Sequence, residues 1–368
     1  NNIGINSYMD EDKMIIVGRT FNPPLAPLDC GNSGTTMRLL AGLLGGLNMP
    51  AILVGDSSLS HRPMDRIIEP LSNMGIKINS TNGLAPITIK KATRVLSLEY
   101  KMEISSAQIK SALLFAGICA NKQISISEKY HSRNHTEIML ENIGYDINSC
   151  NNKILFEPSN TEIKNINIDI PGDISSAAFF IGAACMIPNS DLRINNILIN
   201  NTRMGFINIL NKMGAGVIIH NKRNINGEEV GDIQVYYKPL YGIDITSDDI
   251  PYIIDELPIL SVVATQAEGM TIISGAEELR YKESDRIRSI VYNLNNMGVK
   301  VIEKKDGFII EGPSILNKAK IKSYNDHRVA MSFVIAGISS GNYNEIDNID
   351  CINNSYPEFI NTLNKIIR

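Results

Sequence analysis

Two kinds of helix-length segment alternate along the chain. One kind is apolar at nearly every position, and such a helix is typically buried in the centre of a domain. The other kind is amphipathic and is followed by two short alternating segments that predict a β-hairpin. The chain therefore repeats the order strand, buried helix, strand, amphipathic helix and hairpin, which indicates a series of supersecondary units. The predicted buried helices are residues 36–48, 107–120, 175–187, 255–267 and 327–338.

A glycine ends each amphipathic helix in a similar local sequence, such as Asn-Met-Gly or Asn-Ile-Gly. Glycine is expected there because the end of a helix often requires a left-handed residue. The dipeptides Asn82-Gly83 and Asp306-Gly307 predict two of the hairpin turns. Since the first such glycine is Gly4, we expect a truncated first unit followed by five nearly whole ones. The recurring glycines are Gly4, Gly75, Gly144, Gly214 and Gly298.

Composition is consistent with an α/β protein of about two domains. The chain has 368 residues, of which 43% are apolar and 20% are charged. A net charge of −4 argues against nucleic-acid binding, and the apolar runs are shorter than the ~18 residues that cross a bilayer. Cys119 and Cys185 lie in apolar helical runs and predict reduced core thiols. We therefore expect a cytoplasmic protein that binds neither nucleic acid nor membrane.

Residues 29–38 place small and hydroxyl-bearing side chains at the start of a predicted buried helix. Free backbone N–H groups at such a start can bind phosphate or carboxylate, although Asn and Ser also cap helices for structural reasons alone. The segment has neither the Walker pattern nor the dinucleotide pattern. Arg62, before an amphipathic helix, is either an anion ligand or a solvated surface charge.

Residues 105–110 and 132–137 begin two further helices. The spacing of Asn134 and Glu137 predicts a capping box. His131 and His135 are four residues apart, but no HExxH pattern is present, so we interpret them as solvated histidines rather than metal ligands.

The charged segments near the end of the chain are the most informative. Asp255 and Glu256 precede a buried helix predicted from Leu257 to Ala267, and acids at that position complement the helix dipole. Cations near helix starts are not explained in that way. They indicate an anionic-substrate site with acid–base groups, whereas the alternative is a charged, solvated rim. The cations are Lys282, Arg286 and Arg328.

Taken together, these segments resemble the 5-enolpyruvylshikimate-3-phosphate (EPSP) synthase family in the order in which that family has them. The resemblance implies a two-domain inside-out α/β barrel built from βαβαββ units, with domains at 1–170 and 171–368 and a substrate cleft between them. The matching segments are Gly31–Arg38, Arg62–Met64, Ser106–Gln108, Ser132–His135, Gly172–Ser176, Ile254–Pro258, Lys282–Arg286 and Asn325–Arg328.

The resemblance implies transfer of the enolpyruvyl group of phosphoenolpyruvate to the 5-hydroxyl of shikimate 3-phosphate, with release of phosphate. It implies no metal and no organic cofactor, a monomer, and inhibition by glyphosate at the phosphoenolpyruvate subsite. Asp255 is the expected base at the 5-hydroxyl, and Glu283 is the expected acid–base group at C3 of phosphoenolpyruvate. The neighbouring cations favour the carboxylate form of Glu283, so we expect it to become a proton donor only when the substrates are bound.

By the same resemblance, two groups of residues bind the substrates. Gly34, Arg62, Arg286 and Arg328 are expected to hold phosphoenolpyruvate. Shikimate 3-phosphate is expected to contact Ser106, Gln108, Ser132, Asp255 and Lys282, with Arg133 as a neighbour.

The chain departs from the family pattern in two places. No Lys-Ser-x-x-x-x-Arg stretch precedes the other motifs, so we expect the chain as it stands to have little activity. Asn354 stands where many members have a lysine, which we interpret as a mark of subtype.

Two alternatives are a UDP-N-acetylglucosamine enolpyruvyl transferase and an inactive anion-binding remnant. The first usually has a cysteine just before the Arg-Pro motif, but residues 55–61 contain none. The retained acids Asp255 and Glu283 argue against the second.

Overall fold

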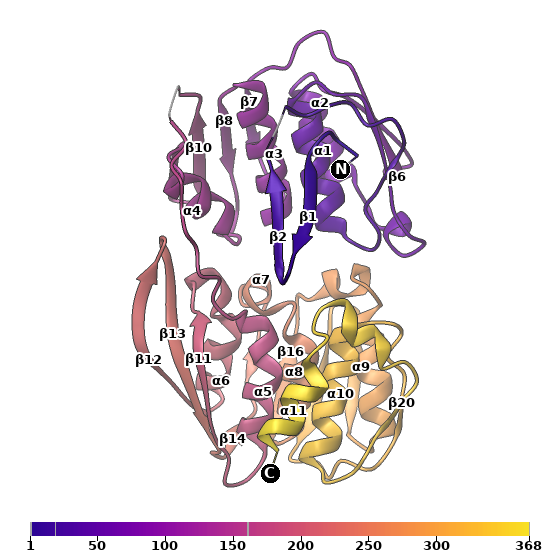
Figure 1. The fold of residues 1–368 in the computed structure, drawn as a ribbon. Helices are drawn as coiled ribbons and strands as arrows, with labels where there is room; N and C mark the ends of the chain where they lie inside the picture. The colour runs from indigo at the N-terminus through magenta and orange to yellow at the C-terminus, as the bar shows by residue number, and fades with distance from the viewer. Residues whose placement is uncertain (1, 19, 160–161, 368) are drawn as a thin grey trace. The chain divides into compact units, whose positions relative to one another are not determined.

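The computed structural model describes residues 2–18, 20–159 and 162–367 (Figure 1). The chain divides into two compact units, Asn1–Ile166 and Asn167–Arg368, and each is described by itself. The observed division precedes the boundary predicted close to Pro171.

Unit 1 contains two four-stranded sheets and the separate hairpin β1–β2. The sheets have the strand orders β3-β4-β6-β5 and β7-β8-β10-β9. Its strands are β1 (Asn6–Asp10), β2 (Lys13–Val17), β3 (Leu28–Asp29), β4 (Ala51–Val54), β5 (Lys77–Thr81), β6 (Leu84–Lys90), β7 (Leu98–Lys101), β8 (Ile124–Ser127), β9 (Asp146–Cys150) and β10 (Lys153–Glu157). Its helices are α1 (Gly34–Gly46), η1 (Leu59–His61), α2 (Asp65–Asn73), α3 (Ala107–Ala120) and α4 (His135–Asn142).

Unit 2 contains the three-stranded sheet β11-β13-β12, a five-stranded sheet of order β14-β16-β18-β17 in which β15 also pairs with β16, and the pair β19–β20. Its strands are β11 (Asp191–Leu198), β12 (Gly216–Ile225), β13 (Glu228–Tyr236), β14 (Leu240–Tyr241), β15 (Asp244–Ile245), β16 (Ala267–Ile273), β17 (Val301–Lys304), β18 (Gly307–Gly312), β19 (Lys320–Ile321) and β20 (Glu345–Ile346). Its helices are α5 (Ile174–Met186), η2 (Asn201–Arg203), α6 (Gly205–Lys212), α7 (Ile250–Ile253), α8 (Leu257–Ala264), η3 (Glu277–Tyr281), α9 (Arg286–Asn296), α10 (His327–Ser339), η4 (Asp350–Asn354) and α11 (Phe359–Ile366).

The predicted order of strand, buried helix, strand, amphipathic helix and hairpin is confirmed. In the copy that begins at β7, this strand runs parallel to β8, and β10 then pairs antiparallel with both β8 and β9. The copy that begins at β3 has the same pairing. Each sheet therefore places the returning hairpin strand beside the strand that follows the buried helix.

The repeated glycine ends each amphipathic helix in a Schellman motif. Gly75 has φ +82°; its N–H donates to Ser72 O at 2.8 Å, and Ile76 N–H donates to Leu71 O at 3.2 Å. The same two bonds recur at Gly144, Gly214 and Gly298. These bonds satisfy carbonyl groups that the end of a helix leaves without partners inside the helix.

A further backbone bond ties each glycine turn to the chain beyond its hairpin. Leu96 N–H donates to Met74 O, directly before Gly75, at 2.8 Å. Even at Gly4 the bond is present, from Asn22 N–H to Ile3 O at 2.9 Å. The glycine motif therefore fixes where the chain starts its next strand. The corresponding donors and acceptors are Lys164 and Ile143, Tyr241 and Met213, and Asn317 and Met297.

The apolar helices form the centres of the two units, as predicted. In unit 1, α1 lies directly against α3, and a Cβ atom at Gly42 would be 2.0 Å from Ala112 O. A Cβ atom at Gly46 would be 2.4 Å from Ala116 O, so side chains are excluded at both positions along this contact. In unit 2, α5, α8 and α10 pack against one another (Figure 1). Among the described helices, none is both long and apolar enough to cross a membrane.

All five cysteines have free thiols. Burial raises the pKa of Cys119 to about 11 and that of Cys185 to about 12, so both remain protonated at neutral pH. They contribute to packing, as their apolar surroundings in the sequence predicted.

Two local predictions were wrong. The helix predicted from Leu257 to Ala267 ends at Ala264, because its last carbonyls are satisfied by Thr265 and Gln266, and Ala267 already begins β16. The second error concerns the turn of the hairpin formed by β17 and β18. Residues 305 and 306 form this turn, rather than Asp306-Gly307. Gly307 lies in the strand, where a Cβ atom would be 1.9 Å from Ile273 O.

We expect Gly75→Ala to lower the free energy of unfolding of unit 1 by about 2–3 kcal/mol. A left-handed conformation costs an L-residue ~1–2 kcal/mol, and the added Cβ would lie 2.7 Å from Arg94 O. The measurement is denaturant unfolding.

Gly31→Ala is the matched control, since Gly31 has φ +54° and no atom within 4 Å of an added Cβ. Gly31→Ala should lower the free energy of unfolding only by the cost of the left-handed conformation. Equal losses in the two variants would contradict a steric role for the contact with Arg94.

Candidate functional site

Parallel strand pairing brings helix starts and loops together in every copy of the repeat. The buried helix begins after the first strand, and a loop begins after the second, which is parallel to the first. The carboxyl ends of parallel strands meet at the same edge of a sheet, so the helix start and the loop are neighbours there. Nearly all of the site residues predicted from the sequence lie at these edges.

In unit 1, Gly34, Arg38 and Arg62 lie at the edge formed by β3 and β4, and Gln108, from the start of α3, meets them there. Arg38 Nη1 donates to Gln108 Oε1 at 2.7 Å, and Gln108 Nε2 donates to Thr35 Oγ1 at 2.7 Å. A Cβ atom at Gly34 would be 2.7 Å from Arg38 Nη1 and 3.2 Å from Arg62 Nη1. Two guanidinium groups therefore lie beside the start of α1, where they can complement an anion.

The start of α1 also has a structural cap. Ser33 Oγ accepts a hydrogen bond from Thr36 N–H at 3.1 Å, which is the capping alternative considered for this segment. The start of α3 is different, because the Ser106 side chain makes no capping bond within the described chain.

Ser132 lies in the loop between β8 and α4, which is held against the start of α3. Tyr130 N–H donates to Ser105 Oγ at 2.9 Å, and Lys110 Nζ donates to Ser132 O at 3.3 Å. Arg133, which follows Ser132, is partly exposed in the same loop. Ser106, Gln108 and Ser132 are thus brought together by α3 and this loop.

The capping box predicted for Asn134 and Glu137 is wrong. Glu137 is buried and pairs with Lys110 Nζ at 2.6 Å, because the fully buried ammonium group requires a counter-charge. His131 Nδ1 lies 3.6 Å from Glu128 Oε1 at a partly exposed position. Over the described residues, no group of three His, Cys, Asp or Glu side chains is placed to hold a metal ion.

In unit 2, Arg286 is the centre of a cluster of charges. Its side chain is 1% exposed and bonds Asp326 through Nε at 2.8 Å and Nη2 at 3.2 Å. Nη2 also donates to Glu283 Oε2 at 2.7 Å. Nη1 lies 3.6 Å from Asp255 Oδ1 and has no hydrogen-bond partner among the residues described. Burial opposes the charged form, but the carboxylates of Asp326 and Glu283 outweigh it and raise the pKa of Arg286.

Asp326 connects this cluster to α10. It accepts from Arg328 N–H at 3.0 Å as the helix cap and from Ser284 Oγ at 3.1 Å. Burial would raise the pKa of Asp326, but the charge and hydrogen bonds of Arg286 hold it below its usual value. Sequence reasoning gave Asp326 no role of its own. Its position directly before a buried helix was the available indication.

Arg328 reaches two further elements of unit 2. Its Nη1 donates to Ser175 Oγ at 2.8 Å and to the backbone oxygen of Asp255 at 3.0 Å. The Ser175 hydroxyl in turn donates to Glu256. Lys282 Nζ lies 3.9 Å from Asp255 Oδ1, so the site residues predicted in unit 2 lie in one cluster.

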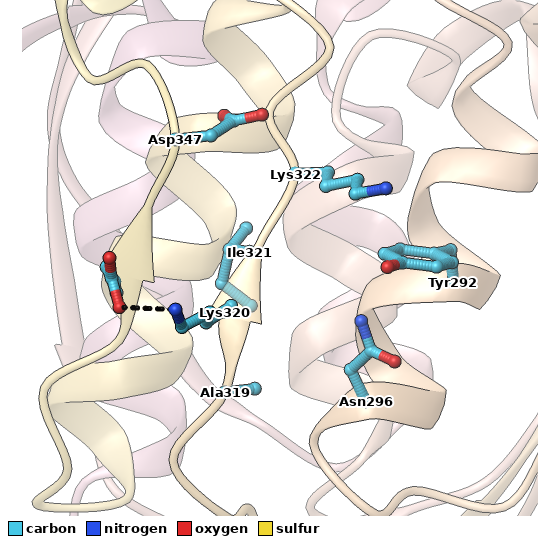
Figure 2. Close-up of a pocket in the computed structure, with 8 residues that line it drawn as sticks. Tyr292, Asn296, Ala319, Lys320, Ile321, Lys322 and Asp347 are labelled. Atoms are coloured by element: carbon cyan, nitrogen blue, oxygen red, sulfur yellow. Dashed lines mark ion pairs between the residues drawn. The ribbon is translucent and has the colours of Figure 1, made fainter.

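A separate hollow of about 510 Å³ lies elsewhere in unit 2 (Figure 2). It is lined by Tyr292, Asn296, Lys322 and neighbouring residues and contains none of the predicted site residues. Lys322 lies over the Tyr292 ring, and Lys320 pairs with Glu345, so its charges are largely matched internally. The hollow is not the candidate site.

Comparisons with known proteins show what the chain is similar to. A family model described as EPSP synthase (3-phosphoshikimate 1-carboxyvinyltransferase) matches residues 1–363. A 3-phosphoshikimate 1-carboxyvinyltransferase of Petrotoga mobilis is 44% identical, with 100% of this chain and 86% of the relative covered. One from Thermoanaerobacter sp. strain X514 is 42% identical, with 99% and 86% covered.

Solved structures give the same result. An EPSP synthase from Acinetobacter baumannii has a TM-score of 0.86 and 37% identity, covering 99% of this chain and 85% of its own. The enolpyruvyl transferase NikO from Streptomyces tendae has a TM-score of 0.73 at 14% identity, covering 99% and 84%, and therefore shows likeness of fold alone.

We expect Asp326→Asn to lower the free energy of unfolding of unit 2 by about 3 kcal/mol at pH 7, since it breaks a buried ion pair. The pKa of Asp326 is lower in the folded state than in the unfolded state. Its contribution is therefore complete above the unfolded value of about 4 and is lost as the pH falls through the folded value. The variant should show a shallower loss of stability in acid.

Denaturant unfolding between pH 3 and pH 7 measures both effects. The control is Asp350→Asn, which removes an exposed carboxylate of the same unit and should change stability by less than ~0.5 kcal/mol. If Asp326→Asn loses unfolding free energy between pH 7 and pH 3 as steeply as the parent protein does, the ion pair of Asp326 is not the cause of that loss.

Proposed function

Because the chain belongs to the EPSP synthase family, it is a transferase that moves the enolpyruvyl group of phosphoenolpyruvate to the 5-hydroxyl of shikimate 3-phosphate in aromatic biosynthesis, and we propose specific roles for its site residues. The observation on which the proposal rests most heavily is the buried guanidinium of Arg286, surrounded by the acids Asp255, Glu283 and Asp326. It combines a fixed cation for substrate anions with carboxylates for proton transfer.

Phosphoenolpyruvate is held by arginines in this proposal. Arg286 Nη1 is buried and has no hydrogen-bond partner within the described residues, so it is free to donate to a carboxylate or phosphate oxygen. Arg328 is oriented by Ser175 and by the backbone of Asp255. Arg62 lies beside Gly34, whose lack of a side chain leaves room for an anion near the start of α1. Planar guanidinium groups suit this role because they form paired hydrogen bonds.

Shikimate 3-phosphate is assigned to the start of α3 and to the neighbouring loop, with Lys282 and Asp255 as contacts from unit 2. Ser106 supports this assignment because its side chain makes no capping hydrogen bond to a described backbone N–H of α3. Gln108 is held in place by Arg38 and Thr35.

Asp255 is proposed as the base that takes the proton of the 5-hydroxyl. A base must be in its carboxylate form before it accepts a proton. Lys282 Nζ and Arg286 Nη1 lie 3.9 and 3.6 Å from Asp255 Oδ1 and stabilise that form. As the 5-oxygen attacks C2 of phosphoenolpyruvate, C3 gains a proton from Glu283. The tetrahedral intermediate then releases phosphate while C3 returns a proton to Glu283, which restores the enolpyruvyl double bond.

Glu283 must be protonated for the first step, yet its carboxylate accepts a hydrogen bond from Arg286 Nη2 at 2.7 Å. Binding of phosphoenolpyruvate brings negative charge to the same guanidinium. That charge competes with Glu283 for Arg286 and favours uptake of a proton by Glu283. The substrate thereby prepares its own proton donor.

The finer architecture is also part of the proposal. We assign the repeated units to an inside-out barrel in each of the domains 1–170 and 171–368, with β1–β2 as the hairpin of a further unit. The recurring bond between Asn22 and Ile3 supports that assignment, because it matches the bond at every other glycine turn. The working form is proposed to be a monomer.

We predict that Glu283→Gln, in an active full-length form of the protein, lowers kcat by ~10²-fold or more, the usual contribution of a general acid–base group. The affinity for shikimate 3-phosphate should stay within a few-fold of the parent value, because the amide has the same shape. Steady-state kinetics and calorimetry measure the two quantities.

Glu278→Gln is the matched control, because Glu278 is 45% exposed and lies 3.8 Å from the neighbouring Lys282. Its kcat should remain close to the parent value. Full turnover by Glu283→Gln would remove Glu283 from the chemistry.

We predict that Gly34→Ala raises the inhibition constant of glyphosate at least tenfold while the KM of phosphoenolpyruvate rises only a few-fold. The new methyl group would lie within 3.2 Å of Arg38 and Arg62, which must then move. Glyphosate is longer than phosphoenolpyruvate and tolerates that movement less well. An inhibition series at fixed shikimate 3-phosphate measures both constants, and equal changes would show that Gly34 does not distinguish the ligands.

A further inference from the structure

The turn before α10 contains two residues in the left-handed region of the backbone. Tyr324 has φ +54° and Asn325 has φ +58°. This region is unfavourable for a residue with a Cβ atom, and a bulky aromatic residue is uncommon there. Such a conformation persists only where the surrounding structure holds it. Asp326 and Arg328 follow directly, so the conformation of the turn decides where these two residues of the candidate site lie.

The turn before α1 has the same conformation without the same cost. Counted back from the capping residues Ser33 and Asp326, Gly31 takes the place of Tyr324, and its φ is also +54°. Glycine adopts this conformation readily because it has no side chain. The copy of the repeat at α10 therefore has a tyrosine where the copy at α1 has a glycine, and something else must hold its turn.

Asp347, directly after β20, holds the beginning of this turn. Its Oδ1 accepts hydrogen bonds from Ser323 N–H at 2.8 Å and from Ser323 Oγ at 2.7 Å. Ser323 is fully buried, and it accepts from Asp326 N–H at 3.0 Å and from Asn325 N–H at 3.3 Å. Burial would raise the pKa of Asp347, but the hydrogen bonds from Ser323 hold it below its usual value. Asp347 therefore acts on the turn as a carboxylate.

Asn348 holds the far side of the same turn. Its Nδ2 donates to Asn325 Oδ1 at 2.7 Å, and its N–H donates to Asp347 Oδ1 at 2.7 Å. Asp347 also lines the hollow of Figure 2, so its carboxylate is at the surface of unit 2 and not in the candidate site. The loop after β20 thus holds the residues on both sides of Tyr324.

We propose that Asp347 is a positioning residue for phosphoenolpyruvate, which holds the left-handed turn at Tyr324 through Ser323 and thereby places the residues that begin α10. The inference rests on the proposed contacts of Arg286 and Arg328 with this substrate. Asp326 accepts from Arg286 Nε at 2.8 Å and from Arg328 N–H at 3.0 Å. A turn that leaves its left-handed form therefore displaces the group that fixes both arginines.

The first test removes the acceptor of the turn in an active full-length form of the protein. If the competent turn falls to about a tenth of the molecules, the apparent affinity for phosphoenolpyruvate falls tenfold. Asp347→Ala should therefore raise the KM of phosphoenolpyruvate about tenfold. The kcat should stay within about threefold, because saturating substrate selects the competent form. Steady-state kinetics measure both constants, and a parent KM in Asp347→Ala would overturn the proposal.

Two comparisons show whether the loss is specific. Shikimate 3-phosphate is assigned mostly to residues of unit 1, so calorimetry should find its affinity within about twofold of the parent value. Asp347→Asn keeps Oδ1 as an acceptor and should raise the KM of phosphoenolpyruvate by about threefold at most. Equal losses for the two substrates, or equal losses in the alanine and asparagine variants, would contradict a role through the turn.

The second test introduces the residue that the copy at α1 has. In the Asp347→Ala background, Tyr324→Gly should lower the KM of phosphoenolpyruvate at least threefold (about), because glycine adopts the left-handed form without help. Tyr324→Ala is the matched control, since it removes the same ring contact with Tyr292 but retains a Cβ atom. It should leave the KM of Asp347→Ala unchanged. Equal KM values in the two double variants would show that Asp347 does not act on the conformation of the turn, and would overturn the proposal.

Glu345→Ala is the control for loss of a carboxylate beside the hollow. Glu345 lies in β20, its side chain is 68% exposed, and it pairs with Lys320 at 3.7 Å. This variant should keep the parent KM, and thermal melts establish that each variant is folded. A rise in KM equal to that of Asp347→Ala would reduce the effect to a general loss of charge and overturn the proposal.

The outcomes also separate this inference from the contact on which it rests. If Arg328→Ala leaves the KM of phosphoenolpyruvate unchanged, the proposed contact of Arg328 and the positioning role both fail. If Arg328→Ala raises this KM but Asp347→Ala does not, the contact stands and the positioning role fails.

Discussion

Parallel pairing between the first two strands of each repeat is the constraint from which the site follows. It places the start of a buried helix and the loop after the second strand at one sheet edge. Gly34 and Arg62 meet at such an edge, as do Ser106 and the loop of Ser132. The Schellman turns support the same geometry from the opposite end, because they fix where each new first strand begins. A repeat with this pairing brings polar groups together in every copy.

Buried ion pairs then give these edges their chemistry. Arg286 and Asp326 join the start of α9 to the start of α10, and Arg328 extends the network to Ser175 and Asp255. An arginine at 1% exposure is held only because several carboxylates surround it. The same carboxylates are the groups proposed to move protons. The stability of this cluster and the protonation of its acids therefore both depend on the charge of Arg286 and its carboxylate partners. A bound substrate anion would change that balance of charges.

The sequence predicted the parts of the molecule that depend on local pattern. Apolar runs located the buried helices, and the recurrent glycines located the helix ends, because both follow from backbone periodicity and conformation. Pairing between distant side chains could not be predicted in this way. The spacing of Asn134 and Glu137 fits a capping box, but Lys110 lies far away in sequence and competes successfully for Glu137. For the same reason, Asp326 was not recognised as the partner of Arg286.

The buried cluster around Lys110 in α3 and the buried cluster around Arg286 at the start of α9 leave different hydrogen-bonding groups without partners in the described part of the chain. In unit 2, the acids take two of the guanidinium nitrogens of Arg286 and leave Nη1 as a donor without a partner among the described residues. In unit 1, Glu128 takes the donors of Ser132 and leaves an acceptor. One repeated scaffold thus differs from copy to copy in the hydrogen bonds that its own carboxylates have already formed.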